Sequence, residues 1–410
     1  MERVAPTRLG GSFRWLLGAT WTSNLGDGLA LAAGPLLVAH LAGSPFLVAL
    51  AATLQWLPPL VFGLAAGVVT DRVDRRRVVV AVGLARVVVL AVLVTAVVTD
   101  VVGIGLVLLV LFLLGVAEVF GDNAGATLLP TLVPRDDLAL GNARLFAGFI
   151  TLQQLAGPPV GALLFAAGAA WPFAAQAVLL LAGAVLITRI VLPPAPARVA
   201  ARAHLEIVEA LRWTWAHANV RTLVLTIFLF NLTYGAAWSV LVLYARDRLG
   251  LGALGYGAVT ATIAGGGVIA TFAYGAITRR VSLGNLMRVG LVVETLTHLA
   301  LALTTTPWVA YLVFAVFGAH AFVWGATSMT VRQRAVPLDL QGRVNSVNTV
   351  GTFGGLVIGS TIGGALADHF GVVAPFWFAF VGSALLVVLL WRQLTHVAHA
   401  DATGQAPGSA

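Results

Sequence analysis

The 410 residues are 59% hydrophobic and only 10% charged, and the mean hydropathy is +0.96. A soluble domain carries roughly 25% charged residues, so this composition excludes an ordinary soluble fold and predicts a chain that lies in lipid. The sequence has no cysteine, which excludes disulfides, thiol chemistry and cysteine-based metal sites.

Twelve apolar runs follow one another along the chain, and each is long enough to cross a bilayer, which takes about 20 apolar residues. They predict an all-α membrane protein with twelve transmembrane helices in two six-helix bundles. The runs cover residues 15–41, 46–69, 78–99, 102–127, 139–168, 172–192, 220–245, 254–277, 285–304, 308–331, 343–367 and 374–394.

Arginine is distributed unevenly among the connections between these runs. The connections that follow the odd-numbered runs hold only Arg246 and Arg248, whereas the connections that follow the even-numbered runs are rich in arginine. Since cytoplasmic loops carry an excess of basic residues, both termini are predicted to be cytoplasmic. The same effect accounts for the net charge of +8, so no nucleic-acid partner is expected. The arginine-rich connections contain Arg72, Arg75, Arg76, Arg77, Arg135, Arg198, Arg202, Arg212, Arg279, Arg280, Arg332 and Arg334.

Residues 193–218 interrupt the pattern of spans. Prolines at 193, 194 and 196 end the sixth run, and the following segment has apolar residues on one face and charged residues on another. This pattern predicts a cytoplasmic linker with an amphipathic helix on the membrane surface. The linker divides an N-terminal bundle, 1–192, from a C-terminal bundle, 219–395, and a polar, disordered tail is expected at 396–410.

The two halves share gap-free identities at a constant separation of 203 residues, as from Pro134 to Pro337. A parallel six-plus-six repeat is typical of two-bundle transporters, whose substrate site lies between the halves near the midplane. The repeated residues are Pro134, Asp136, Asn142, Gly161, Ala162, Leu163, Pro172 and Phe173, matched by Pro337, Asp339, Asn345, Gly364, Ala365, Leu366, Pro375 and Phe376.

The connection between the second and third runs reads Gly67-Val-Val-Thr-Asp71-Arg72-Val-Asp-Arg75-Arg76-Arg77. It resembles the signature loop of the major facilitator superfamily, with Asp74 where a second glycine is usual. The form is similar to the branch of drug:proton antiporters that includes macrolide and enterobactin exporters. The resemblance implies a conformational role for Gly67, Asp71, Arg72 and Arg76, in which Asp71 and Arg72 form a charge clasp on the cytoplasmic side.

Gly157-Pro158-Pro159-Val160-Gly161, in the fifth run, resembles the antiporter motif of the same branch. Glycine permits close helix contact and proline loosens the backbone, so this span can bend or rotate against a neighbour. Ordinary packing of a kinked helix is the alternative. Many drug antiporters also carry an arginine in the fourth span, whereas residues 111–117 contain none here. The proton route through that arginine therefore does not carry over, and Arg86 in the third run is interpreted as structural.

Ionisable side chains inside a span are costly unless paired or solvated, so each is a candidate functional residue. Asp27 lies mid-span, one turn after Asn24, and is predicted to couple protons or substrate; a hydrogen bond between helices is the alternative. Glu118, in the fourth run, is predicted to couple protons or to bind a cationic substrate. Asp122, one turn further, is expected to brace the signature loop.

Glu294 and His298 are spaced one helical turn apart in the ninth run. Proton coupling and a bracing pair both remain open for them, and bracing is favoured because the ninth helix is a peripheral support in the superfamily. His320, near Trp324 in the tenth run, leaves the same choice. No third ligand lies near in sequence, so no metal site is expected.

Polar and aromatic side chains in mid-span are the candidates for a substrate cavity. A large, mostly apolar pocket with a few polar groups suits amphipathic organic molecules. Glutamine and tryptophan also serve in helix packing, which is the alternative for each residue. The candidates are Asn24, Gln55, Trp56, Gln153, Gln154, Gln176, Asn231, Tyr234 and Trp238.

These patterns predict a monomeric, multi-pass protein of the bacterial inner membrane. It is expected to export a lipophilic drug, antibiotic or siderophore-like molecule in exchange for protons, by alternating access. Proton-coupled uptake by a symporter or facilitator is the alternative, and the Gly157-Pro158 pair disfavours it. The sequence contains no nucleophile motif, metal cluster or phosphate loop, so neither an enzyme nor a cofactor is expected. The partners are the substrate, protons and the lipid bilayer.

Overall fold

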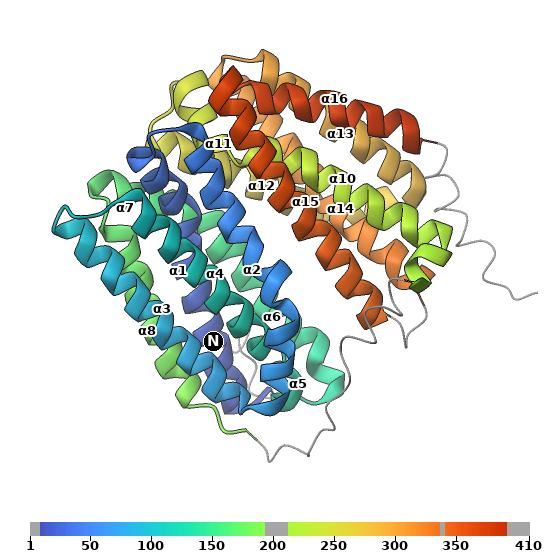
Figure 1. The fold of residues 1–410 in the computed structure, drawn as a ribbon. Helices are drawn as coiled ribbons and strands as arrows, with labels where there is room; N and C mark the ends of the chain where they lie inside the picture. The colour runs from blue at the N-terminus through green and yellow to red at the C-terminus, as the bar shows by residue number, and fades with distance from the viewer. Residues whose placement is uncertain (1–8, 193–211, 337–340, 392–410) are drawn as a thin grey trace, which may run out of the picture. The chain divides into compact units, whose positions relative to one another are not determined.

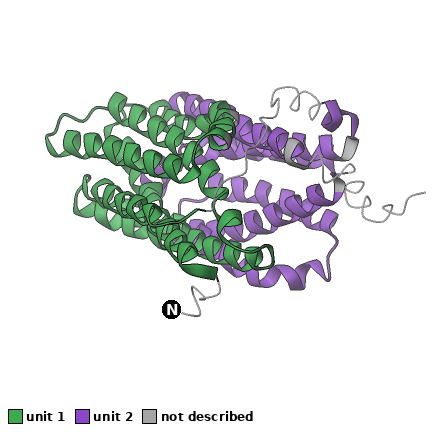
Figure 2. Ribbon diagram, turned by 90° about the horizontal axis from the view of Figure 1, so that it is seen from below, with its two compact units in different colours: residues 1–201, 251–261 green, residues 202–250, 262–410 purple. Residues whose placement is uncertain are grey.

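A computed structural model describes residues 9–192, 212–336 and 341–391. The regular structure of these residues is helical throughout (Figure 1). The chain forms two compact units (Figure 2): unit 1 comprises Met1–Ala201 and Leu251–Ala261, and unit 2 comprises Arg202–Gly250 and Thr262–Ala410. Most of the predicted linker, 193–211, and the predicted tail, 396–410, lie outside the described residues.

Unit 1 is built from long helices joined by short connections, coloured blue to green in Figure 1. Phe13, Leu16 and Leu17 of its first helix pack with Leu128 and Ile190 in a buried apolar cluster. Its elements are α1 (Gly10–Leu41), α2 (Pro45–Arg72), α3 (Arg75–Val98), α4 (Ile104–Ala126), α5 (Leu129–Leu132), η2 (Arg135–Asp137), α6 (Leu138–Gly148), η3 (Phe149–Ala156), α7 (Gly157–Ala167) and α8 (Trp171–Thr188).

Unit 2 holds the later helices, and its core includes Leu223, Ile227, Met287 and Leu291. The helix α12 begins in the segment assigned to unit 1 and continues into unit 2. The elements are α10 (Ala218–Trp238), α11 (Leu241–Leu243), η4 (Tyr244–Arg248), α12 (Ala253–Thr278), α13 (Leu283–Leu303), α14 (Pro307–Ala335), α15 (Gln341–Phe370) and α16 (Ala374–Leu390).

Capping residues in the sequence set several helix starts. Ser44 accepts a hydrogen bond from the backbone N–H of Leu47 at the start of α2, where Pro45 occupies the first turn. Asp74 accepts one from the backbone N–H of Arg77 at the start of α3. Such side chains satisfy backbone donors that have no partner within the helix.

Ten helices in the described part of the chain are long and apolar enough to cross a membrane. The helix α16 is apolar but shorter, with 17 residues, and α1 is not among the ten. The predicted helical class is therefore confirmed, whereas the count of twelve spans stays a prediction. The predicted first and last runs, 15–41 and 374–394, correspond to α1 and α16.

The fifth predicted span is interrupted by a π-helical segment. Arg135–Ala167 forms one candidate span of 33 residues, in which η3 separates α6 from α7. Such wider turns frequently occur at functional sites. Here η3 ends where the Gly157-Pro158 pair begins, so the backbone departs from regular α-helix next to the antiporter-like motif.

Glycine allows the helices of each unit to approach closely. A Cβ atom on Gly161 of α7 would overlap the backbone of Leu29 on α1, and one on Gly157 would overlap Gly28. In unit 2, Gly359 of α15 makes the same kind of approach to the backbone of Leu232 on α10. Each unit thus packs its first long helix against a later glycine-bearing helix, as in small-residue packing in membranes.

Candidate functional site

A cavity of about 260 Å³ lies inside unit 1, among α1, α3, α4 and α8. Several of the residues that line it are small and leave space for it, among them Ala19, Gly83, Gly121 and Gly183. The polar side chains that line it come from three different helices. This volume has room for several water molecules and offers them hydrogen-bonding partners. The polar lining residues are Thr20, Ser23, Asn24, Asp27, Arg86, Glu118 and Asp122.

An ion pair between Asp27 on α1 and Arg86 on α3 lies at this cavity. The two side chains are only 15% and 10% exposed. Gln176 on α8 donates a hydrogen bond from Nε2 to the same carboxylate oxygen of Asp27, at 3.3 Å. A buried charge without a partner costs several kcal/mol, so each member of the pair depends on the other.

Two polar atoms beside the pair have no hydrogen-bond partner among the described residues. They are Nε of Arg86 and Oε1 of Gln176, and both are buried. Most buried polar atoms in native proteins are paired with protein groups or ordered water. Arg86 lines the cavity, so its unpaired Nε favours water or a polar ligand there, whereas Gln176 is not among the lining residues.

Glu118 and Asp122, one turn apart on α4, line the same cavity as the ion pair. Glu118 is partly buried and Asp122 is exposed. Together with Asp27 they supply three carboxylates beside the single guanidinium of Arg86. The lining thus has more acidic than basic groups, and Arg86 has more than one possible counter-ion within the cavity.

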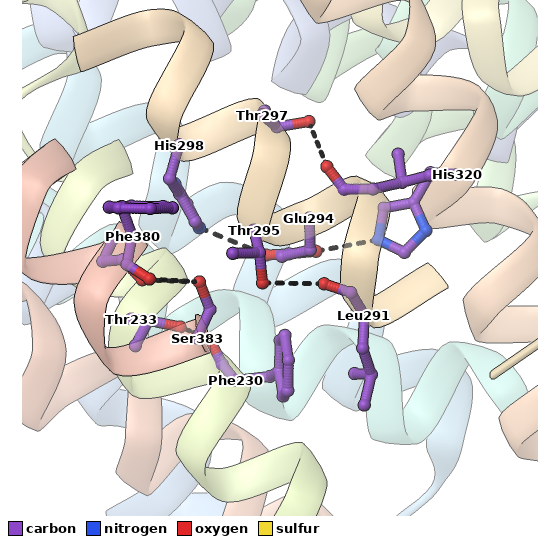
Figure 3. Close-up of polar contacts among 12 residues, drawn as sticks. Phe230, Thr233, Leu291, Glu294, Thr295, Thr297, His298, His320, Phe380 and Ser383 are labelled. Atoms are coloured by element: carbon purple, nitrogen blue, oxygen red, sulfur yellow. Dashed lines mark hydrogen bonds and ion pairs between the residues drawn. The ribbon is translucent and has the colours of Figure 1, made fainter. Parts of the chain in front are cut away.

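A second group of titratable side chains lies in unit 2, and Figure 3 shows its contacts. Glu294 of α13 lies between His298 of the same helix and His320 of α14. Oε2 of Glu294 is 2.8 Å from Nε2 of His320, and Oε1 is 3.6 Å from Nε2 of His298. We call these three residues the Glu294 cluster. The cluster joins two helices, which the sequence spacing alone did not indicate.

Three predicted cavity residues lie on α10, and two of them belong to an aromatic group. Tyr234 stacks on Trp238 with ring centroids 4.6 Å apart, and Trp238 lies 4.4 Å from Phe317 of α14. The rings of Trp238 and His298 are also nearly perpendicular, with centroids 5.7 Å apart. Asn231 instead donates a hydrogen bond from Nδ2 to the carbonyl of Ile227 on its own helix.

The remaining predicted cavity residues are divided between several helices. Asn24 lines the unit 1 cavity beside Asp27, whereas Gln55, Trp56, Gln153 and Gln154 are not among its lining residues. Gln55 is exposed on α2 and Trp56 partly buried. Gln153 and Gln154 lie on η3, where the carbonyl of Gln153 approaches Gly28. Their role in binding stays a prediction.

The signature-like loop joins α2 to α3 within unit 1. Arg76 donates a hydrogen bond to the carbonyl of Ile190 at 2.8 Å, which ties the start of α3 to the end of α8. Gly67 lies in open space on α2, and Arg72 is the last, exposed residue of that helix. The side chain of Asp71 lies outside the described set. The charge clasp predicted for Asp71 and Arg72 therefore stays a prediction.

From the sequence, Arg86 is expected to be structural, and the role of His320 is open between bracing and proton coupling. An arginine in the apolar helix α3 needs an anionic partner, so the nearby acidic residues of other spans are the signal that identifies it. The partner of His320 lies on another helix, so the sequence offers no spacing from which to find it.

In the described part of the chain, two compact helical units with ten candidate spans and ionisable side chains buried between helices are typical of a polytopic membrane transporter. The chain matches the model of the transmembrane secretion effector family over residues 2–409. It belongs to this family of the major facilitator superfamily.

Two curated relatives span almost the whole chain. The chain is 29% identical over 387 residues to the multidrug efflux pump Tap of Mycolicibacterium fortuitum. The matched region covers 88% of this chain and 90% of Tap. It is 26% identical over 395 residues to the enterobactin exporter EntS of Salmonella typhimurium, with 92% of each chain covered. The family and these relatives make the protein an efflux transporter of the major facilitator type, and not an enzyme.

Solved transporter structures share the fold. A bacterial homologue of the iron transporter ferroportin in the inward-facing state aligns with a TM-score of 0.75 at 18% identity, over 93% of this chain and 98% of that one. The nucleoside transporter NupG aligns with a TM-score of 0.74 at 12% identity, over 94% of this chain and 100% of NupG. At these identities the likeness concerns the fold alone.

Proposed function

We propose that this transporter exports a lipophilic, amphipathic small molecule in exchange for protons, by alternating access. The twelve spans, the cytoplasmic termini, the bacterial inner membrane and the monomeric state belong to the same proposal. A multidrug efflux pump and an enterobactin exporter as full-length relatives support this substrate class. The aromatic group of Tyr234, Trp238 and Phe317 on α10 and α14 supplies apolar surface of the kind that such molecules need.

The observation that carries the proposal is the ion pair of Asp27 and Arg86 at a polar cavity. A proton on Asp27 removes the charge that holds Arg86 and leaves a neutral carboxyl. Arg86 can then pair with Glu118 or Asp122, which line the same cavity. Protonation of Asp27 thereby moves the counter-ion of Arg86 from α1 to α4.

This exchange links protonation to the packing of α1, α3 and α4. A contact made in only one state shifts the balance between states by its own free energy. The helix α1 also carries Gly28 and Leu29, against which Gly157 and Gly161 of the antiporter-like motif pack. A change in the contacts of Asp27 therefore acts on the helix that packs against this motif.

The direction of transport tests the proposal. Inverted membrane vesicles with an acid interior should accumulate lipophilic antibiotics or enterobactin, because the outer face of the membrane then lies inside the vesicle. Collapse of the pH gradient with a protonophore should release the accumulated compound. Accumulation in intact cells that increases with external acidity would instead establish uptake, and the export proposal would be wrong.

A further inference from the structure

The Glu294 cluster has no part in the proton exchange proposed for unit 1. Its three residues are all buried: Glu294 and His320 are each 8% exposed and His298 is 0% exposed. One carboxylate therefore faces two imidazoles, one at hydrogen-bonding distance and one slightly beyond it (Figure 3).

Residues on the two helices of the cluster supply no further charge at its level. On α13, Arg288 lies six positions before Glu294, and its guanidinium bonds to the carbonyl of Trp391. On α14, Tyr311 lies nine positions before His320, and Arg332 and Arg334 lie twelve and fourteen positions after it. Each of these separations exceeds one and a half helical turns, at 3.6 residues per turn.

The neighbouring helices add no charge either. The helix α12 approaches α14 closely at Gly266 and Gly318, and its only titratable residues are Tyr256 and Tyr274. The helix α16 packs against α13, and Ala374–Leu390 contains no titratable residue. The helix α10 contributes Arg221, far along the helix, and Tyr234, whose ring stacks on Trp238 and Phe317. An ionised Glu294 can therefore be neutralised only by a proton on one of the two imidazoles, among the described residues.

This composition makes the cluster a store for one proton. One carboxylate and two imidazoles with one added proton have zero net charge, whichever of the three groups holds it. Loss of that proton leaves a buried negative charge, and a second proton leaves a positive one. Both are costly away from water, so the proton count should change only when the cluster becomes hydrated.

His298 is the member whose hydrogen bonding is incomplete. Neither of its ring nitrogens has a hydrogen-bond partner among the described residues, and the ring is fully buried. An unpaired buried nitrogen is unfavourable, so the ring is expected to gain a partner in another state. We infer that Glu294, His298 and His320 form a second proton-binding site, at which His298 accepts the proton and Glu294 and His320 hold it. As a site for a transported proton it rests on the proposed proton-driven export.

The cluster also touches the candidate substrate-binding residues. The ring of Trp238 packs nearly perpendicular to that of His298, and Trp238 also packs on Tyr234 and Phe317. A molecule that stacks on Tyr234 or Trp238 changes the packing around His298. Substrate and proton then affect each other's binding, and this coupling is reciprocal.

Nitrogen NMR of the wild-type protein with isotope-labelled histidine tests the site without any substrate. Signals would be assigned with the variants His298→Gln and His320→Gln, and the exposed His40 and His369 are internal controls. The signals of His298 and His320 should change together as the cluster gains or loses its shared proton. A fixed protonation state of both rings over the whole pH range measured would overturn the inference and leave a bracing cluster.

A second measurement concerns the proton count of transport. In proteoliposomes, Glu294→Gln should lower the number of protons exchanged per exported molecule by about one, because the cluster is then neutral without the stored proton. An unchanged ratio would contradict the second site. If wild-type transport proves independent of the pH gradient, the proposed function fails, and the NMR titration still decides whether the cluster binds exchangeable protons.

Discussion

Arg86 on α3 and Asp27 on α1 form a buried ion pair, and the same carboxylate oxygen accepts a hydrogen bond from Gln176 on α8. Three helices of unit 1 thus converge on one carboxylate. A proton that binds there changes contacts on all three helices at once, which is why the account of transport centres on this residue.

Replacement of Arg86 by glutamine should leave Asp27 as a buried charge without its partner. Such a loss costs about 3–5 kcal/mol in folding free energy at neutral pH. Thermal unfolding of the variant and the wild-type protein in detergent at neutral pH measures this loss, and an unchanged unfolding temperature would contradict the proposed role of the pair.

The double variant Asp27→Asn with Arg86→Gln removes both charges together. It should recover much of the stability that Arg86→Gln loses, because no buried charge remains without a partner. It should still lack proton-driven export, since no carboxyl group remains at position 27. The comparison of unfolding temperature and transport between the single and double variants separates folding from coupling. Restored transport in the double variant would show that the pair is structural only.

The sequence predicted the class of the fold because hydropathy and arginine placement act locally along the chain. It also singled out Asp27 and Glu118, since ionisable residues in apolar runs are rare. The pairing of Asp27 with Arg86 was not predicted, because the two residues are 59 positions apart and meet only after helix packing. His320 and Glu294 are 26 positions apart and meet across two helices for the same reason.

The interruption at η3 also escaped prediction. Proline and glycine at 157–161 indicated a kink, whereas the structure places the irregular backbone one turn earlier, at Phe149–Ala156. The close approach of Gly28 to the carbonyls of Leu152 and Gln153 accompanies this segment. This irregular backbone depends on contact with α1, and local sequence patterns do not indicate that contact.

Gly161→Ala should destabilise unit 1, because the added Cβ would overlap the backbone of Leu29 and force α7 away from α1. Overpacking of this kind costs about 1–3 kcal/mol. The matched control is Gly63→Ala on α2, where an added Cβ meets nothing within 4 Å. Unfolding temperatures of both variants in detergent check the difference. Equal temperatures would mean that the approach at Gly161 is not a constraint on packing.

Gly125→Leu should fill part of the unit 1 cavity without a clash. Gly125 lines the cavity, and a Cβ added to it meets nothing within 4 Å. The variant should fold normally yet export several-fold more slowly, because water and polar ligands lose space beside Asp27. Gly105→Leu on the same helix is the control, since Gly105 also has open space but does not line the cavity. Equal export rates for both variants would exclude a role for the cavity.

The most direct test of the central claim compares the wild-type protein with Asp27→Asn in inverted vesicles under an imposed pH gradient. The account predicts that Asp27→Asn loses gradient-driven accumulation of substrate, by about ten-fold or more, yet still exchanges labelled for unlabelled substrate at equilibrium. Asp100→Asn, at an exposed position where asparagine also tolerates the positive φ of 56°, should behave as wild type. Full gradient-driven accumulation by Asp27→Asn would contradict the account.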